Sequence, residues 1–129
     1  MKSKSHFLGK IFNKQHHKNI EVNVDLIEYS ENDIYYVYSP ALDLVGYGKN
    51  HAEARASWET VLGEYIGYTL NKNTLTKDLV SRGWKVKRNK IVTPPSFTWM
   101  LENNSDLTNV YNKHDFSKRS QPVSLPVFA

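Results

Sequence analysis

The feature that most limits the possible folds is a long helix with a clear beginning, placed directly after two closely spaced glycines. Gly46 and Gly48 allow backbone angles that other residues avoid, and Asn50 is a good N-cap. Glu53, three residues later, completes a capping-box pattern, so a helix is predicted to begin at about His51. Apolar residues then recur at spacings of three and four, which predicts one face buried against a sheet. The members of this stripe are Ala54, Trp58, Val61, Leu62, Tyr65, Ile66 and Thr69.

The segment before this helix has the two-residue period of β-strands. Apolar and polar residues alternate over residues 20–26, and residues 30–33 have the composition of a turn. Residues 34–39 are rich in tyrosine and β-branched side chains, which predicts the returning strand of a hairpin. Pro40 ends that strand, and residues 42–45 offer a third short one. We therefore predict an α+β fold, in which an antiparallel three-stranded sheet and a packed long helix follow the order strand, strand, strand, helix.

Shorter elements are predicted after the long helix. Thr74 is expected to cap a short helix that Gly83 closes, and the alternating residues after Gly83 indicate a further strand or a hairpin. Ser96 and Asp106 are expected to cap short C-terminal helices. Residues 121–129 alternate like a strand but contain two prolines, which lack amide donors. That tail is therefore predicted to be an edge strand or an arm.

The length of 129 residues indicates one globular unit that can bury a core without disulfides. We divide it into a basic N-terminal leader at 1–19, an α+β domain at 20–92 and a C-terminal extension at 93–129. The chain has no cysteine, which favours a reducing, cytoplasmic location. It has neither the roughly 20-residue apolar run of a membrane span nor the apolar core of a signal peptide. We therefore expect a soluble protein that has no membrane partner.

Charge is strongly segregated along the chain. Residues 1–19 carry five lysines and no acid, residues 20–64 carry nine acids against two basic residues, and residues 77–90 carry six basic residues against one acid. Such segregation bears on partners and not on fold. Lysines and apolar residues fall on different sides of a short helix in the leader. This pattern is also seen in arms that bind nucleic acid or a membrane surface, but we favour a terminal extension whose apolar residues dock on the domain or on a second subunit.

Residues 40–54 carry a resemblance to a known family. A proline-to-glycine strand end leads there into a helix that opens with Glu-Ala. Over residues 20–70 the chain resembles the HicB-like antitoxin family, whose members have a strand-strand-strand-helix unit similar to part of the ribonuclease H fold without its catalytic carboxylates. Lys49 stands where the family often has Asp, Asn50 where it often has Thr, and Gly46-Tyr47 where it has Gly-Cys. The residues that fill the motif are Pro40, Gly48, Asn50, Glu53 and Ala54.

The resemblance implies an antitoxin that binds and neutralises a small RNA-cleaving toxin of the HicA type by protein–protein contact. The acidic block would then face a basic surface of the toxin; alternatively, its acids only keep the sheet and the helix solvated. Many family members also carry a helix-turn-helix or ribbon-helix-helix module for operator binding, and neither can be placed in this sequence. The candidate toxin-binding residues are Asp25, Glu28, Asp43, Glu59 and Glu64.

The basic segment offers an alternative function, the binding of DNA or RNA. It combines phosphate-attracting charge with a tryptophan ring that could stack on a base, although a tryptophan in an alternating strand is more often part of the core. The candidate nucleic-acid-binding residues are Arg82, Trp84, Lys85, Lys87, Arg88 and Lys90.

No enzymatic function is predicted. A two-metal nuclease would need clustered carboxylates, but Asp25 and Glu28 should lie on opposite strand faces, Asp43 lies in a turn and Glu53 is used in capping. His51 has no recognisable triad partners, and the chain has no phosphate-binding loop. We therefore assign no catalytic residue, metal ligand or cofactor. The alternating tail and the apolar hairpin lead us to expect a homo-oligomer.

Overall fold

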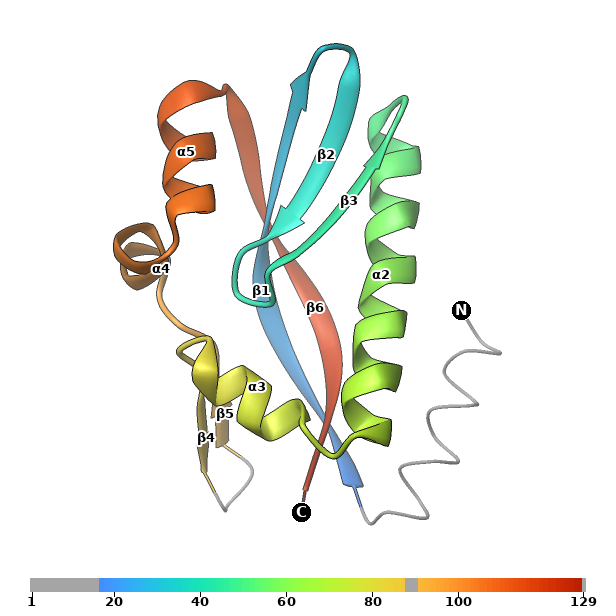
Figure 1. The fold of residues 1–129 in the computed structure, drawn as a ribbon, viewed down its shortest axis with the longest axis vertical. Coiled ribbons are helices and arrows are strands. Elements are labelled where there is room, and N and C mark those ends of the chain that lie inside the picture. The colour runs from blue at the N-terminus through green and yellow to red at the C-terminus, as the bar shows by residue number, and fades with distance from the viewer. Residues whose placement is uncertain (1–16, 88–90, 129) are drawn as a thin grey trace.

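The computed structural model describes residues 17–87 and 91–128, which form a four-stranded antiparallel sheet with helices on both sides (Figure 1). The strand order is β3-β2-β1-β6, and a separate two-stranded ribbon pairs β4 with β5. The strands are β1 (His17–Glu31), β2 (Ile34–Ser39), β3 (Leu44–Gly48), β4 (Lys85–Lys87), β5 (Ile91–Thr93) and β6 (Phe116–Phe128). Residues 1–16 of the predicted leader lie outside the described residues, and 17–19 belong to β1.

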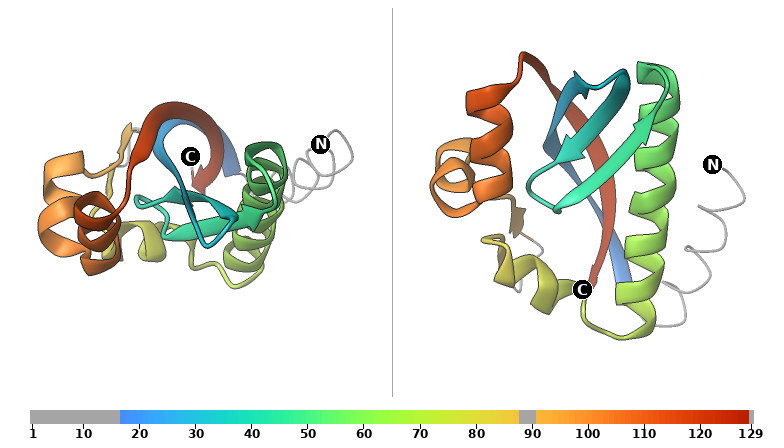
Figure 2. Two further views of the ribbon diagram at one scale, coloured as in Figure 1. Left: turned by 90° about the horizontal axis from the view of Figure 1, so that it is seen from above. Right: turned by 45° about the horizontal axis from the view of Figure 1, so that its top comes forward.

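The helices are α2 (His51–Asn71), α3 (Leu75–Ser81), α4 (Phe97–Asn103) and α5 (Ser105–Lys113). Figure 2 shows that the strands lie between α2 on one side and α4 with α5 on the other. The α3 helix and the β4–β5 ribbon lie together at the lower end of the molecule in Figure 1. Within residues 17–87 and 91–128, no helix combines the length and the apolar character that a membrane span requires.

The predicted α+β fold is confirmed, since three antiparallel strands precede the long helix. The sheet has one strand more than predicted because β6, from the predicted C-terminal extension, pairs with β1 along all of its 13 residues. This strand is an edge strand, as the prolines indicated, and it begins at Phe116, ahead of the predicted residue 121. An edge position tolerates Pro122 and Pro126 because the missing amides need no partner on the open side.

A two-residue turn fixes the register of the first hairpin. Asn32 and Asp33 have φ angles of 54° and 65°, and the pair Glu31–Ile34 closes the turn. Two consecutive residues with positive φ characterise the turn type whose twist matches that of antiparallel strands. The predicted turn at residues 30–33 is therefore confirmed, and it determines which side chains of β1 and β2 lie opposite each other.

Gly46 allows β3 to lie against the backbone of α2. A Cβ atom at Gly46 would be 2.2 Å from the Trp58 amide nitrogen and 2.6 Å from the Ala54 carbonyl oxygen. A Cβ atom at Gly48 would be 2.5 Å from the Glu53 Cβ. The two glycines thus permit a close strand–helix contact that no larger residue would allow.

Two buried tryptophans join distant parts of the chain. Trp58 on α2 donates from Nε1 to Ser39 Oγ on β2 over 2.8 Å, and both residues are buried. Trp84, just before β4, donates from Nε1 to the Ala41 carbonyl oxygen over 2.7 Å. Each indole therefore combines a large apolar contact with a satisfied polar group. The apolar stripe predicted for the long helix faces the core in part: Ala54, Trp58, Ile66 and Thr69 are buried, whereas Val61, Leu62 and Tyr65 are half-buried.

The predicted helix caps agree with the structure in part. Asn50 Oδ1 accepts a hydrogen bond from the Glu53 amide, and the Glu53 carboxylate accepts one from the Lys49 amide. The capping box is therefore present, except that the second donor is the amide of Lys49 and not that of Asn50. Ser96 caps α4, and Gly83 follows α3 with a φ of 93°. Thr74 is the N-cap residue of α3 as predicted, although its side chain makes no capping hydrogen bond. One cap was predicted wrongly, because Asn104 caps α5 in place of Asp106, which lies in the first turn.

Candidate protein-binding surface

Strand pairing determines which side chains share each face of the sheet. Ser39 points toward α2, because it accepts the hydrogen bond from Trp58. Side chains alternate along a strand, so Tyr36 points to the opposite face. Tyr36 pairs with Tyr29 on β1 and with Tyr47 on β3. Three tyrosine rings therefore lie side by side across β1, β2 and β3 on the face away from α2.

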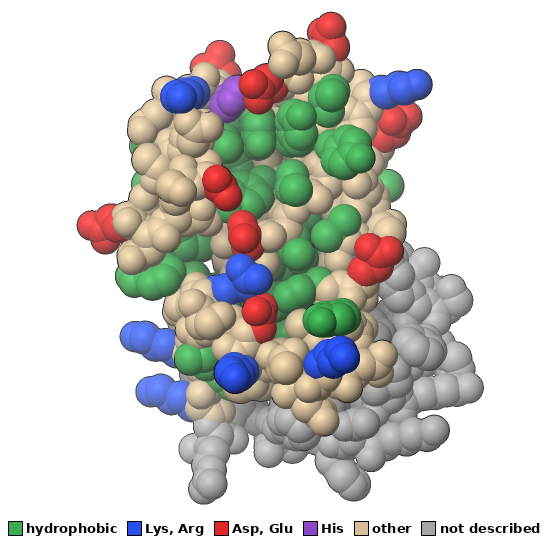
Figure 3. All heavy atoms as spheres, in the orientation of Figure 1, with side chains coloured by type: hydrophobic (Ala, Val, Ile, Leu, Met, Phe, Trp, Pro, Cys, Tyr) green, Lys and Arg blue, Asp and Glu red, His purple; other side chains and the backbone are tan. Residues whose placement is uncertain are grey.

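These rings form a continuous apolar surface. The centroids of Tyr29 and Tyr36 are 5.1 Å apart in a stacked arrangement, and those of Tyr36 and Tyr47 are 6.5 Å apart. Tyr47 is 64% exposed, and two exposed aliphatic side chains on the same strands extend the surface. Figure 3 shows hydrophobic side chains gathered over β2 and β3. We call this surface the tyrosine face; it consists of Tyr29, Ile34, Tyr36, Val45 and Tyr47.

The C-terminal helices cover only one side of the tyrosine face. The Tyr29 ring lies 5.0 Å from the ring of His114, which follows α5. Asn104, between α4 and α5, donates from Nδ2 to the Tyr38 hydroxyl over 2.8 Å. On β3 the Tyr47 amide donates to Ser57 Oγ of α2 over 3.2 Å, which anchors the backbone while the ring remains exposed. The exposed part of the tyrosine face thus lies on β3, a strand whose backbone is hydrogen-bonded to α2.

Acidic side chains lie at the margin of the tyrosine face. Glu31 and Asp33 stand at the β1–β2 turn, and Asp106 stands in the first turn of α5; all three are exposed. Burial is the main cause that raises the pKa of Tyr29, and the negative charges of Glu31 and Asp106 raise it further. We call Glu31, Asp33 and Asp106 the acidic rim.

Glu28, a predicted toxin-binding residue, is buried and already paired. Its side chain points to α2, is 4% exposed, and accepts two hydrogen bonds from Arg55, at 2.8 Å and 3.0 Å. Arg119 on β6 lies 3.1 Å away, and His51 Nδ1 lies 3.7 Å away. The hydrogen bonds from Arg55 are the main cause that lowers the pKa of Glu28 against the opposing effect of burial. The carboxylate joins β1, α2 and β6, so it does not offer a contact to a partner.

The other predicted toxin-binding acids do not share one surface with Glu28. Asp25 is half-buried on β1, whereas Glu59 and Glu64 are exposed on α2. Asp43 lies in the turn between β2 and β3, where it accepts a hydrogen bond from the Tyr38 hydroxyl and lies 3.5 Å from Arg82. The acidic block in the sequence is therefore split between a buried ion cluster, a turn and the outer side of a helix.

Two of the predicted nucleic-acid-binding residues are engaged inside the protein. Trp84 is 2% exposed and donates to a buried carbonyl, so its ring cannot stack on a base. Arg82 pairs with Asp78 at 3.0 Å and with Asp43, which commits its charge to the protein itself. Lys85 and Lys87 are exposed on β4. The remaining two candidates, Arg88 and Lys90, lie outside the described residues.

A polar hollow of about 300 Å³ lies between the β2–β3 turn, α3 and the start of α5. Asp43, Arg82, Trp99, Asn104 and Asp106 contribute to its lining. Arg82 pairs with Asp43 within this hollow, so the groups left to attract a cationic side chain are the Asp106 carboxylate and the exposed Trp99 indole. Among residues 17–87 and 91–128, no three His, Asp or Glu side chains lie close enough together to hold a metal ion.

The sequence contained a signal for the tyrosine face that we did not use. A two-residue turn at residues 32–33 places Tyr29 opposite Tyr36, and alternation then places both on one face. Tyr47 requires the β2–β3 register, which local patterns do not supply.

Comparison with known proteins found no similar protein. No protein-family model, no curated protein and no solved structure matches the chain.

Proposed function

We propose that the chain is a non-catalytic binding protein that holds a small basic partner protein on its tyrosine face. The observation that carries this proposal is the row of rings from Tyr29 to Tyr47 on a sheet face that the described helices cover only in part. Tyrosine is enriched at protein interfaces because it offers a large rigid contact and a hydroxyl. Exposed apolar patches on a soluble domain commonly mark such interfaces.

Charge specifies the kind of partner. The acidic rim lies at the margin of the face, and one of its members, Asp106, also lines the polar hollow with Asp43 and Arg82. A basic protein would be guided to this surface, because complementary charge speeds the encounter and fixes the orientation. Nucleic acid would be repelled from it. A lysine or arginine of the partner fits the hollow beside the face.

From the resemblance to the HicB-like antitoxins, we propose that this partner is a HicA-type RNA-cleaving toxin. In this proposal the chain neutralises the toxin by covering its basic surface. The acids of this proposal are those of the acidic rim, since Glu28 is internal and Glu59 and Glu64 lie on α2, on the other side of the sheet.

The test uses the product of the adjacent reading frame, co-expressed with the full chain. We expect a small basic protein that co-purifies, cleaves RNA when alone and loses that activity in the complex. Tyr47→Ala should weaken the complex at least about tenfold, the effect of losing one central aromatic contact. Tyr68→Ala is the matched control, because Tyr68 is 65% exposed but lies on α2. Equal losses from the two substitutions, or no basic protein in the complex, would overturn the proposal.

A further inference from the structure

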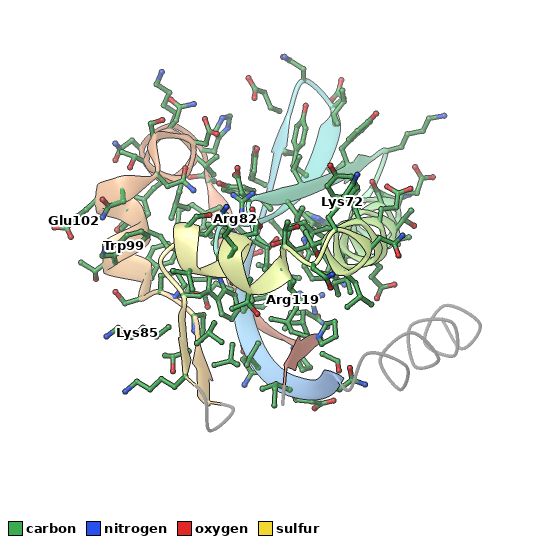
Figure 4. The ribbon with its side chains drawn as sticks, turned by 60° about the horizontal axis from the view of Figure 1, so that its bottom comes forward. Lys72, Arg82, Lys85, Trp99, Glu102 and Arg119 are labelled. Atoms are coloured by element: carbon green, nitrogen blue, oxygen red, sulfur yellow. The ribbon has the colours of Figure 1, made fainter. Side chains whose placement is uncertain are left out.

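The lower end of the molecule carries a group of exposed lysines from three elements. Lys72 follows the last turn of α2, Lys77 lies on α3, and Lys85 and Lys87 lie on β4. Figure 3 shows Lys and Arg side chains at this end, and Figure 4, which views it directly, shows Lys72 beside α2 and Lys85 on the far side of α3, on the β4–β5 ribbon. We call these four lysines the basic pole.

The charges of the basic pole are not used within the described part of the protein. No ion pair joins any of the four lysines to an acid among residues 17–87 and 91–128. The one acid of α3, Asp78, is already engaged by Arg82 at 3.0 Å and by the Tyr65 hydroxyl. Arg82 thus neutralises the local acid, and the lysines remain available to an anionic ligand.

An exposed aromatic ring adjoins one of the four lysines, Lys72. Tyr68 lies one turn before the end of α2, and the Lys72 Nζ atom is 5.9 Å from its ring centroid. Surfaces that bind single-stranded nucleic acid combine lysines, which contact phosphates, with exposed rings, on which bases stack. Lys85 and Lys87 point to the same side of β4, about 6.6 Å apart along the strand, which is comparable to the distance between neighbouring phosphates.

The basic pole is remote from the tyrosine face. Tyr47 lies before the first turn of α2 and Lys72 after its last, and a helix of 21 residues is about 31 Å long. This separation is several times the screening length of about 8 Å at physiological salt. The acidic rim therefore does little to reduce the potential at the basic pole.

We infer that the basic pole binds single-stranded RNA or DNA without reading its sequence, through lysine–phosphate contacts and one base stacked on Tyr68. The indole that could have added a second stacking surface, Trp84, is internal, so the described site has one ring. This function does not rest on the proposed protein partner. It is also compatible with that partner, because the two sites occupy opposite ends of α2.

The test measures binding of the full chain to a fluorescent single-stranded RNA of mixed sequence between 50 and 200 mM salt. Each phosphate contact on a single strand contributes about 0.7 to the slope of log affinity against log salt. Four contacts give a slope of about −2.8, which corresponds to roughly a 50-fold loss over this range. Replacing all four lysines by glutamine should reduce affinity at least about tenfold at 50 mM salt, and Tyr68→Ala should reduce it about fivefold or more.

The control must change net charge equally while leaving the basic pole intact. Lys49, before α2, and Lys113, at the end of α5, are exposed and lie away from it. We expect K49Q/K113Q to retain wild-type RNA affinity and K85Q/K87Q to lose it. Equal losses of RNA affinity in these two double variants would overturn the inference. So would unchanged RNA binding when all four lysines are replaced by glutamine. So would lysine-dependent binding to phosphatidylserine vesicles without binding to RNA, which would assign the surface to a membrane.

Discussion

The tyrosine face lies over the middle and edge strands of the sheet, whereas the basic pole is assembled from the ends of separate elements. In the first, strand register holds Tyr29, Tyr36 and Tyr47 in one row, and the Ser57 hydroxyl anchors the outer strand. In the second, long side chains project from α2, α3 and β4 into solvent. A rigid apolar surface selects a partner by shape, whereas lysines attract any polyanion and respond to salt.

The two regions therefore differ in what would disable them. The tyrosine face depends on the packing of α2 beneath the sheet, and a change in the core should alter it. The basic pole depends on charge alone and should tolerate small shifts of the elements. Substitutions beneath the sheet can test this difference without touching either surface.

The largest effect is expected from Trp58→Ala, which removes the side chain that links α2 to β2. Trp58 is 2% exposed, so the loss of its burial should lower the free energy of unfolding by about 3 to 5 kcal/mol. Urea denaturation followed by circular dichroism measures this change. Trp58→Phe retains most of the volume but loses the hydrogen bond to Ser39, and should cost less. A loss below about 1 kcal/mol for the alanine variant would contradict the packing described here.

A smaller loss of stability is expected from Gly46→Ala, which should affect the tyrosine face but not the basic pole. The new methyl group would meet the Trp58 amide nitrogen at 2.2 Å, so β3 must shift away from α2. Such overpacking costs up to about 3 kcal/mol. The displaced strand carries Tyr47, so partner binding should weaken, while the RNA affinity of the basic pole should persist.

Gly67→Ala is the matched control for this substitution. It makes the same chemical change within α2, where a Cβ atom would have nothing within 4 Å. The higher helix propensity of alanine should stabilise the protein by up to about 1 kcal/mol. Opposite signs for the two substitutions would support the close contact between β3 and α2, and equal signs would contradict it.

Local signals in the sequence predicted much of the fold. The N-caps Asn50 and Ser96, the turn at residues 30–33 and the glycine at position 83 were all predicted from their own neighbourhoods. Each of these depends on hydrogen bonds or backbone angles within a few residues. The α+β class followed from the change of hydrophobic period between the strands and α2.

The long-range contacts could not be predicted from the sequence, because no local pattern encodes them. Residues 116–128 pair with β1, from Tyr29–Phe116 to His17–Phe128, so the paired residues are 87 to 111 positions apart, and this pairing brings Arg119 to Glu28. Glu28 looked like a solvated acid, although its alternation with Leu26 placed it on the buried face. Trp84 fitted both the core and ligand binding, and its burial with a hydrogen bond to Ala41, 43 residues earlier, distinguishes them. The predicted homo-oligomer stays a prediction, which light scattering at micromolar concentration can test.

A loss of stability smaller than those of Trp58→Ala and Gly46→Ala is expected from Glu28→Gln, which weakens the ion cluster beneath the tyrosine face. Arg55 and Arg119 are 45% and 43% exposed, so water compensates them in part, and we expect a loss of about 1 to 2 kcal/mol at pH 7. The folded-state pKa of Glu28 lies below its ordinary value of 4.5, so its contribution is complete above that pH. It is lost as the pH falls through the lowered pKa.

The pH dependence gives this prediction a second readout. Urea denaturation at pH 7 and pH 3 should show the wild type and the Glu28→Gln variant converging in acid, while Glu64→Gln, on the exposed side of α2, follows the wild type at both values. Because Glu28 holds the first turns of α2 to the sheet, its protonation should loosen the support of the tyrosine face before that of the basic pole. Amide exchange that rises in β3 and the start of α2, but not in α3 and β4, would demonstrate this order. Uniform exchange across both regions would show instead that the two ends of α2 respond as one unit.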